Sequence, residues 1–427
     1  MTVSLPISRD LLPSGASIAP NGELLLHGFE VSEIAERFGT PLFVYDSAHI
    51  IQEARSAKTA ADWDVAYASK AFLCLELVRI FDGLGLFMDV ASGGELHLVL
   101  KAGFDPKRIV MHGNNKSDDE LRMAVEAGVG VVVLDSASEI RRLASIAAAR
   151  GVIQPVLVRV TPGVEAHTHE YIMTGQEDSK FGFSVSSGAA KLAIAEVLAA
   201  KALRYRGIHA HIGSQIFLLD SYAKEVEALS ALVDEFIPEV LNLGGGLGVA
   251  YVSGESSPGF GAWADKLTQA LQKAGVDPSI RIMVEPGRSL VARAAMTLYR
   301  VGTIKELPGL RTYVSVDGGM SDNPRPVLYG SGYEAFMIAG ANLERELTVT
   351  IVGKHCESGD VLVKDAQLPS KLAEGDIIAT PVTGAYGYSM ASNYNRVPRP
   401  PVVFVDADGP RLVARGETLD DLLRLEI

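Results

Sequence analysis

Eight short apolar runs, each followed by a segment of helical periodicity, constrain the fold more than any other feature of this sequence. Near-continuous apolar runs of this length are typical of strands buried on both faces of a parallel sheet. Eight strand–helix units over roughly 240 residues predict a (β/α)8 TIM barrel. The competing fold, an open doubly wound sheet, usually has fewer such units. The runs are Val65–Ser69, Leu86–Val90, Arg108–His112, Gly130–Asp135, Pro155–Val160, Arg206–Ile212, Val240–Leu243 and Arg281–Glu285.

Beyond about residue 297 the helical pattern almost disappears. Short alternating runs separated by Gly, Pro and Asp follow instead, and this pattern predicts a mainly antiparallel β domain. Two strand-like pieces near the N-terminus, ELLLHG and PLFVYD, precede the first barrel strand, and we expect them to pair with the C-terminal strands. The sequence therefore predicts a barrel over residues 46–297 and a discontinuous β domain formed by residues 1–45 together with 298–427.

Charge and composition exclude several classes of protein. The 427 residues carry a net charge of −13, which argues against a nucleic-acid partner because such a partner calls for a basic face. No run of about 18 apolar residues occurs, so no membrane span is expected. The N-terminal MTVSLPISRD lacks a secretion signal, and two cysteines cannot form a disulfide framework. We therefore expect a cytoplasmic protein.

Lys70 is the first candidate for chemistry, because active sites of (β/α)8 enzymes lie where strands end. It follows the first predicted strand, near Tyr67, Phe72 and Leu73. Partial desolvation there would lower its pKa and prepare it for Schiff-base formation. For any single lysine, a snorkelling or ion-paired side chain is the more common explanation.

A glycine-rich loop, Gly244–Gly248, follows the seventh predicted strand, where barrels of this kind frequently bind phosphate. Glycines let backbone N–H groups approach an anion, and a following helix adds its dipole. The loop is not a dinucleotide fingerprint, because the G-x-G-x-x-G spacing fails at Val249. A tight turn without a ligand explains the loop equally well.

Glu285 and His211 lie at two further strand ends. A carboxylate there could face the ring nitrogen of a pyridine cofactor and keep it protonated, while an imidazole could stack on the ring. Taken singly, each residue has a more common explanation. Glu285 could form a buried ion pair with Arg288, and His211 could be an ordinary core histidine. The combination of these groups favours a cofactor site. It would rarely arise by chance that one barrel mouth holds a lysine, a glycine-rich loop, a histidine and a carboxylate.

The predicted β domain contributes three loops that could carry chemistry. The first begins at Asp317 and contains Arg325 and Tyr329; the second holds Cys356, Glu357 and Asp360; the third is Gly384–Tyr388. A catalytic cysteine must be accessible and activated. Taken individually, each of these is as well explained as an ordinary loop residue.

At these positions the sequence resembles the diaminopimelate decarboxylases, a family of pyridoxal-phosphate enzymes with the alanine-racemase-like fold. The resemblance extends from about Tyr67 to Asn395. The matching stretches are YASKA, DVASGGEL, HGNNK, GVEAHTHE, HIGSQIF, NLGGGLG, VEPGRS, SVDGGMSDNPRPVLYG, VGKHCESGD and TGAYGYSMASNYN.

The resemblance implies a role for each of these residues. Pyridoxal 5'-phosphate would form a Schiff base with Lys70, stack on His211 and pair through its ring nitrogen with Glu285, while Cys356 would donate a proton. No metal is implied. The remaining cofactor-binding positions are Asp89, Ser214, Gly244, Gly245, Gly246, Pro286, Gly287, Arg288 and Tyr386, and the substrate-binding positions are Arg288, Arg325, Tyr329, Glu357 and Tyr386.

The implied reaction is decarboxylation of meso-2,6-diaminopimelate to L-lysine and CO2, the last step of lysine biosynthesis, by a homodimer that shares its active sites. Cys356 and Glu357 would come from the second subunit. Related decarboxylases of ornithine and arginine carry Asp where this chain has Glu357, so the glutamate favours diaminopimelate.

Lys354 and His355, which precede the cysteine, depart from the Gly-Pro-Leu or Gly-Pro-Ile of many members of the family. The alternatives are a decarboxylase of ornithine, lysine or arginine, or a catalytically inactive regulator.

Overall fold

The computed structural model describes residues 5–164 and 179–427; most of the GVEAHTHE stretch, from Glu165 to Glu170, lies outside them. The chain divides into two compact units. We call residues Ala54–Gly248 and Ser257–Ser289 the barrel unit, and the rest, including Val249–Ser256, the sheet unit. The predicted barrel, 46–297, also includes residues 46–53, 249–256 and 290–297, which belong to the sheet unit in the structure. Among the described helices, none has the length and apolar character needed to cross a membrane.

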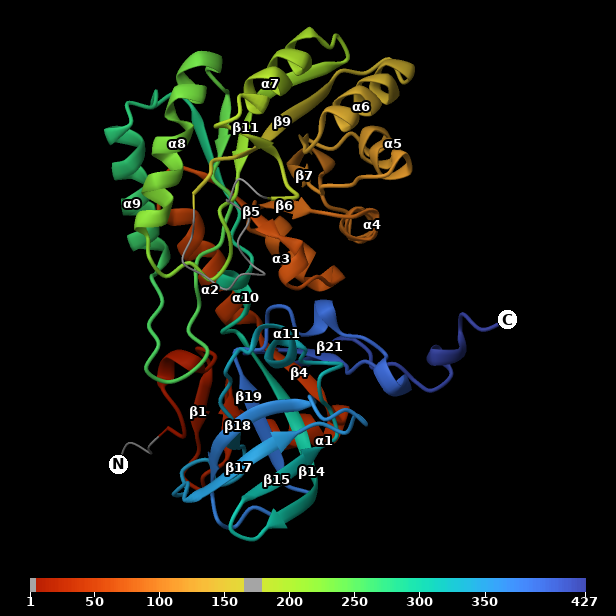
Figure 1. Cartoon of the computed structure of the whole chain (residues 1–427). Coiled ribbons are helices and arrows are strands. Elements are labelled where there is room, and N and C mark those ends of the chain that lie inside the picture. Colours follow the sequence, from red (N-terminus) through yellow and green to blue (C-terminus); the bar gives the residue numbers. More distant parts are fainter. Residues whose placement is uncertain (1–4, 165–178) are drawn as a thin grey trace. The chain divides into compact units, whose positions relative to one another are not determined.

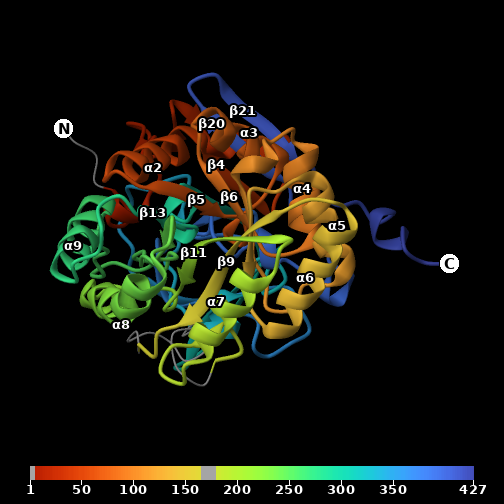
Figure 2. The same cartoon turned by 90° about the horizontal axis from the view of Figure 1, so that it is seen from above.

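Eight parallel strands close into a barrel in the barrel unit (Figures 1 and 2). The ring closes through the pairing of Met283 with Asp64 and of Val284 with Val65. The predicted barrel is therefore confirmed, and the open sheet is excluded. In order around the ring the strands are β5 (Asp64–Ala68), β6 (Phe87–Val90), β7 (Ile109–Met111), β8 (Val131–Leu134), β9 (Gln154–Thr161), β11 (Leu203–Ala210), β12 (Val240–Asn242) and β13 (Arg281–Val284).

Helices surround the strands, as Figure 2 shows in the view from above. One helix begins with a capping box: the Ser117 side chain accepts from the Glu120 N–H, and Glu120 reaches back to the Ser117 N–H, which satisfies two helix-terminal donors. Inside the barrel, one buried cluster combines Ala66, Val110, Val133, Leu157, Val240 and Met283. The helices include α2 (Ser47–Thr59), α3 (Leu75–Gly83), α4 (Gly93–Lys101), α5 (Asp118–Ala127), α6 (Ala137–Ala149), α7 (Ala189–Ala199), α8 (Asp220–Phe236) and α9 (Phe260–Lys273).

The sheet unit is built on a nine-stranded, mainly antiparallel sheet. Its N-terminal member is β4 (Leu42–Asp46), which pairs with β14 (Ala295–Leu307) and with β20 (Val402–Asp406). The predicted pairing of PLFVYD with C-terminal strands is thus present. The other members are β15 (Arg311–Val316), β16 (Phe336–Met337), β17 (Leu347–Val352), β18 (Val361–Leu368), β19 (Ile377–Pro381) and β21 (Gly409–Ala414).

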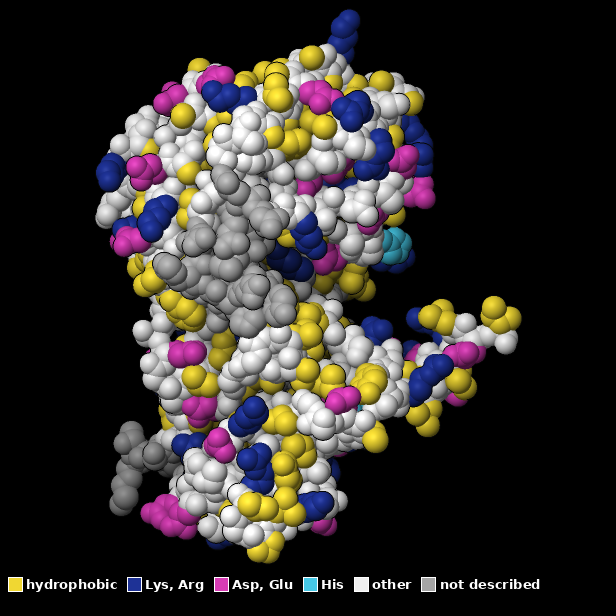
Figure 3. Space-filling view, in the orientation of Figure 1, with side chains coloured by type: hydrophobic (Ala, Val, Ile, Leu, Met, Phe, Trp, Pro, Cys, Tyr) yellow, Lys and Arg dark blue, Asp and Glu magenta, His cyan; other side chains and the backbone are white. Residues whose placement is uncertain are grey.

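The ELLLHG piece does not join that sheet. Its strand β2 (Leu24–Leu26) lies between β1 (Ala16–Ile18) and β3 (Phe29–Glu30) in a separate three-stranded sheet. The chain after β21 forms a single 3-10 turn, Asp421–Leu423, and exposes apolar side chains that Figure 3 shows in yellow. These side chains are Leu419, Leu423, Leu425 and Ile427.

Candidate active site

Lys70 lies in a short 3-10 turn, Ser69–Ala71, directly after β5. Its neighbours Ser69 and Ala71 are buried, but Lys70 itself is exposed, so the partial desolvation expected from the sequence is absent. The lysine is close enough to Asp89 for its charge to act on that carboxylate. Burial raises the pKa of Asp89 to about 6, and the charges of His112 and Lys70 limit the rise.

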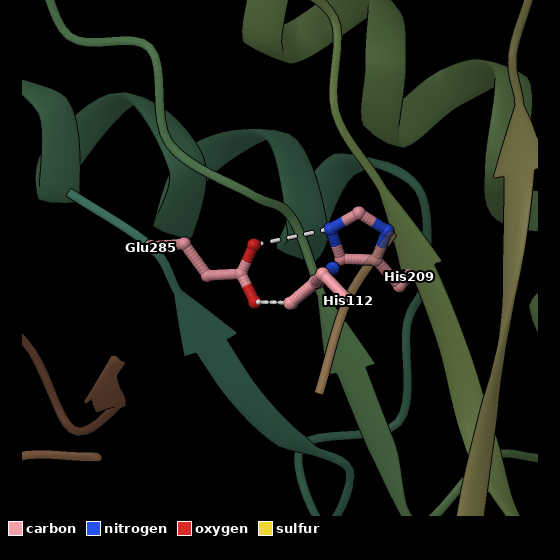
Figure 4. Close-up of side chains that lie close together, drawn as sticks. All are labelled: His112, His209 and Glu285. Atoms are coloured by element: carbon pink, nitrogen blue, oxygen red, sulfur yellow. Dashed lines mark hydrogen bonds and ion pairs between the residues drawn. The ribbon is translucent and has the colours of Figure 1, made fainter. Parts of the chain in front are cut away.

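Glu285 is buried directly after β13, with three N–H donors on its carboxylate. His112 Nε2 lies 2.8 Å from Oε1, and His209 Nε2 lies 3.1 Å from Oε2 (Figure 4). The amide of Asn242 donates to Oε1 over 2.6 Å. The two histidines come from the ends of β7 and β11, and Asn242 ends β12, so four strand ends converge on one carboxylate.

The electrostatics of this cluster make Glu285 an anion. Burial alone would raise its pKa, but the charge and hydrogen bonds of His112 and His209 hold the pKa well below its usual value. Burial lowers the pKa of His209 to about 4, so that ring is neutral near pH 7. Burial also disfavours the charged form of His112, yet Asp89 and Glu285 outweigh it and raise the His112 pKa.

The same three side chains, His112, His209 and Glu285, are close enough together to hold a metal ion. The fourth contact favours a different interpretation. Asn242 occupies Glu285 Oε1 with an amide N–H, which is a hydrogen-bond donor and not a metal ligand. The cluster therefore resembles a carboxylate positioned by hydrogen bonds more than a metal centre.

His211, just beyond the end of β11, is half-buried and receives a hydrogen bond from the Gly245 N–H at Nδ1, over 3.2 Å. Burial lowers its pKa well below the usual value, and the charges of Lys70 and Arg159 act in the same direction. A neutral imidazole accepting at Nδ1 carries its proton on Nε2. The tautomer and the orientation of this ring are thus tied to the glycine-rich loop.

The glycines of that loop are required by close packing. A Cβ at Gly245 would lie 2.0 Å from the Glu285 carbonyl oxygen, and one at Gly246 would lie 2.2 Å from the Gly213 carbonyl oxygen. The position of the loop after the seventh strand predicts that these N–H groups approach an anion. In the structure the Gly244 N–H donates to Asn242 and the Gly245 N–H to His211, so these two amides already have partners.

The Glu285–Arg288 segment contacts other predicted site residues. Arg288 Nη2 donates to Ser214 Oγ over 3.0 Å, which joins the ends of β13 and β11. The Pro286 carbonyl accepts from the Ala68 N–H, two residues before Lys70. A Cβ at Gly287 would lie 3.0 Å from Ala68 Cβ, so a glycine allows this close approach.

Arg325, at the start of α11 (Arg325–Tyr329) in the sheet unit, is 3% exposed. Its guanidinium carbon lies 3.7 Å from the ring centroid of Tyr251, and Nη1 donates to the Tyr333 hydroxyl over 2.9 Å. Ser331 accepts from Nη2, while Nε is buried without a hydrogen-bond partner. Among the described residues, no carboxylate pairs with this cation. Tyr329, on the same helix, is half-buried.

Cys356 and Glu357 are both exposed on a loop that hydrogen bonds to Asp360 stabilise. The Asp360 carboxylate accepts from the His355 N–H and the Met320 N–H, over 2.9 and 2.7 Å. The buried His355 ring lies 2.8 Å from Ser321 Oγ through Nε2. His355, which the sequence analysis left without a role, therefore connects the cysteine loop to the loop that begins at Asp317.

Tyr386 has a left-handed backbone conformation, with φ of 61°. A residue with a side chain adopts this region at a cost in free energy, and such strain clusters at functional sites. The neighbouring Val382 also has a positive φ, 60°, which is more costly still for a β-branched residue.

Several residues around these sites were missed from the sequence. His112, His209 and Asn242 were not identified as partners of Glu285. Arg159, buried in the middle of β9, carried a usable signal, because a charged residue inside the apolar run VLVRV calls for a buried partner; its Nη1 lies 3.8 Å from Asp135. Tyr251 and Tyr333 gave no such signal.

A parallel barrel with a lysine and an anionic glutamate at its strand ends matches one known class of protein. The family described as "Pyridoxal-dependent decarboxylase, pyridoxal binding domain" matches residues 47–292. Full-length relatives define the class further: the diaminopimelate decarboxylases of Halalkalibacterium halodurans and Mycobacterium bovis are 46% and 44% identical to this chain, over 95% and 100% of both chains. The chain belongs to the diaminopimelate decarboxylase family.

Solved structures agree with this assignment. The diaminopimelate decarboxylase of M. jannaschii in complex with L-lysine is 34% identical, covers 97% of this chain and 98% of its own, and superposes with a TM-score of 0.88. The Helicobacter pylori enzyme complexed with L-lysine is 31% identical, covers 93% of this chain and 99% of its own, and has a TM-score of 0.86.

Proposed function

We propose that this chain converts meso-2,6-diaminopimelate and a proton to L-lysine and CO2, with pyridoxal 5'-phosphate as cofactor. The names of the full-length relatives support this reaction, and so do the two solved relatives that hold L-lysine, its product. Loss of CO2 from one end of the substrate and retention of the other require two differently built subsites, one for the cofactor and the reacting end and one for the retained end.

The barrel unit has the groups that the cofactor needs. Pyridoxal phosphate supplies an electron sink for the electrons of the broken C–C bond, provided that its ring nitrogen is protonated. The anionic Glu285 suits that nitrogen, the exposed Lys70 suits the aldehyde carbon, and the neutral His211 suits the ring face. We assign the phosphate to Ser214, Gly246 and Tyr386, since the Gly244 and Gly245 amides already have partners.

One observation carries the choice of substrate: Arg325 is a buried cation without an acidic partner among the described residues. A buried charge without a partner is costly, and a guanidinium pairs best with a carboxylate. Diaminopimelate keeps a second carboxylate after decarboxylation, and this group would pair with Arg325. Ornithine and lysine have only one carboxylate, the one that leaves, so they would leave the arginine unpaired.

The remaining residues orient the substrate and move a proton. Arg288 and Tyr329 would join Arg325 around the retained carboxylate, and Glu357 would bind the retained ammonium group. Cys356 Sγ would deliver the proton that replaces CO2 at the α-carbon. We propose that Cys356 and Glu357 come from the second subunit of a homodimer. The solvent-exposed side chains of both residues are compatible with such an arrangement.

Other substrates of the class have less support. The lysine/ornithine decarboxylase of Vibrio vulnificus is 23% identical with a TM-score of 0.76, and this likeness shows the fold alone. An inactive regulator is disfavoured because Lys70, Glu285 and Cys356 are all present. A cytoplasmic location is supported by the two cysteines, Cys74 and Cys356, which are both free thiols.

The decisive experiment supplies the purified protein with pyridoxal phosphate and measures CO2 release from meso-diaminopimelate, L-lysine, L-ornithine and L-arginine separately. We expect release from diaminopimelate, with L-lysine as the product identified by mass spectrometry. Faster release from any of the other three amino acids would show that the assignment of the substrate is wrong.

A further inference from the structure

The side chain of Asn242, fully buried at the end of β12, connects two parts of the proposed cofactor site. Its Oδ1 accepts from the Gly244 N–H over 2.9 Å, and its Nδ2 donates to Glu285 Oε1 over 2.6 Å. Chemistry sets the orientation of the amide, because a backbone N–H requires an acceptor and a carboxylate requires a donor. One asparagine therefore serves the glycine-rich loop and the buried carboxylate at once.

A second set of contacts makes this connection rigid. The Glu285 N–H donates to the Gly244 carbonyl over 2.7 Å, so Gly244 is tied to Asn242 through its amide and to Glu285 through its oxygen. At Gly245 there is no room for a Cβ beside the Glu285 carbonyl. The first glycines of the loop and the Glu285 backbone are thus joined by both hydrogen bonds and close packing.

The carboxylate itself is held from three sides. His112 donates to Oε1 and His209 to Oε2 (Figure 4). Asn242 also donates to Oε1, so His209 is the one donor among these three that reaches Oε2. The amide has a distinct part in this arrangement, since it is neutral at every pH and cannot lose its donor by titration. Asp89 and Arg159 also face this group of charges.

We propose that Asn242 is a positioning residue that fixes the Glu285 carboxylate and sets the glycine-rich loop relative to it. The ring-nitrogen side and the phosphate side of the cofactor would then be placed by one side chain. This inference rests on the proposed function, because it assigns those two sides to pyridoxal phosphate. A residue that only fills the polar core would affect stability without affecting the state of the bound cofactor.

Two substitutions separate the contacts. Asn242→Asp keeps an oxygen for the Gly244 N–H but places a second carboxylate against Glu285. Because two carboxylates that share a site raise the pKa of one of them, we expect a titration in the absorbance of the bound cofactor that the unsubstituted protein lacks, together with a roughly ten-fold or greater loss of kcat. Asn242→Ser adds no charge but cannot reach both partners, and we expect its Kd for pyridoxal phosphate to rise roughly ten-fold.

The sheet unit offers a matched control. Asn393 Nδ2 also donates to a glutamate, Glu417, over 2.6 Å. Asn393→Asp therefore places a second carboxylate beside a glutamate away from the proposed cofactor contacts, where the neighbouring Arg399 offsets the added charge, and we expect it to leave the pH profile of the cofactor absorbance unchanged. Hydrogen–deuterium exchange of residues 242–248 in the cofactor-free protein gives a readout that needs no catalysis, and Asn242→Ser should accelerate it.

The proposal is overturned if Asn242→Asp leaves both kcat and the absorbance profile within two-fold of the unsubstituted protein, or if Asn393→Asp changes the profile equally. If Asn242→Asp does not fold, an unchanged Kd and unchanged exchange in Asn242→Ser overturn it instead. Failure of the proposed function is distinguishable, because the unsubstituted protein would then bind no pyridoxal phosphate or release no CO2 from diaminopimelate.

Discussion

The guanidinium of Arg325 lies over the ring of Tyr251, with its carbon 3.7 Å from the ring centroid. Tyr251 in turn meets the Tyr333 ring edge-on, at a centroid separation of 5.4 Å and an interplanar angle of 89°. The two tyrosines therefore hold a buried cation in place without neutralising it. A substrate carboxylate could then bind without a large loss of side-chain entropy, which favours affinity.

Tyr251→Leu tests this arrangement. A buried cation–π contact contributes about 2 kcal/mol, so we expect KM for diaminopimelate to rise roughly ten-fold or more while kcat changes little. The control is Tyr313→Leu, because Arg311 lies over the Tyr313 ring at 5.6 Å on a more exposed part of the sheet unit. Equal KM values for Tyr251→Leu and the unsubstituted protein would show that the stacking does not serve the substrate.

Lys70→Ala should remove the visible absorbance band of cofactor bound covalently to the protein, because an alanine has no amine to react with the aldehyde. Activity should be lost with the band. Lys101→Ala, at the end of α4 and also exposed, should retain both the band and activity. Retention of the band in the Lys70 variant would exclude Lys70 as the attachment site.

Alkylation should distinguish the two cysteines. Burial raises the pKa of Cys74 to about 11, so this thiol stays protonated and unreactive near pH 8, whereas Cys356 is exposed. We expect iodoacetamide to modify Cys356 selectively, as mapped by peptide mass spectrometry, and CO2 release to fall in proportion. Cys356→Ala should bind cofactor normally but lose most turnover. Full activity after complete modification of Cys356 would exclude it as proton donor.

Mixing two inactive variants tests the shared site. If Cys356 acts in the partner's site, a dimer of one Lys70→Ala chain and one Cys356→Ala chain contains one intact site. Random exchange of subunits should then restore about a quarter of the activity. The measurement is CO2 release after incubation at a concentration that permits exchange, with each variant alone as control. Absence of recovery, when mass spectrometry detects the mixed dimer, would contradict contribution in trans.

Acid should destabilise the barrel unit through His209. Its pKa is about 4 when folded and 6.5 ordinarily, so between these values the unfolded chain binds more protons. The free energy of unfolding should therefore decline as the pH falls from 6.5 to 4, by at most about 3 kcal/mol. His209→Gln keeps an N–H donor but cannot titrate, so its unfolding curve should depend less on pH in this window. His97→Gln, an exposed control on α4, should not differ from the unsubstituted protein.

Periodicity was enough to predict the barrel. All eight predicted runs overlap the eight strands, since a strand buried on both faces must be apolar along its length and so differs from a helix with one apolar stripe. The capping box of Ser117 and Glu120 is a similarly local feature, because a helix start depends on residues three positions apart. The prediction for ELLLHG was wrong, because its strand pairs with its sequence neighbours β1 and β3 and not with the C-terminal strands.

For the site, the sequence by itself determined which chemical groups end the strands: Lys70, His211, the glycine-rich loop and Glu285. Their contacts were decided by the tertiary structure alone. His112, His209 and Asn242 meet Glu285 from 173, 76 and 43 residues away, and it is this convergence that makes the buried glutamate an anion. A pKa depends on the charges and donors within a few ångströms, and closing the barrel brings those groups together from four separate strands.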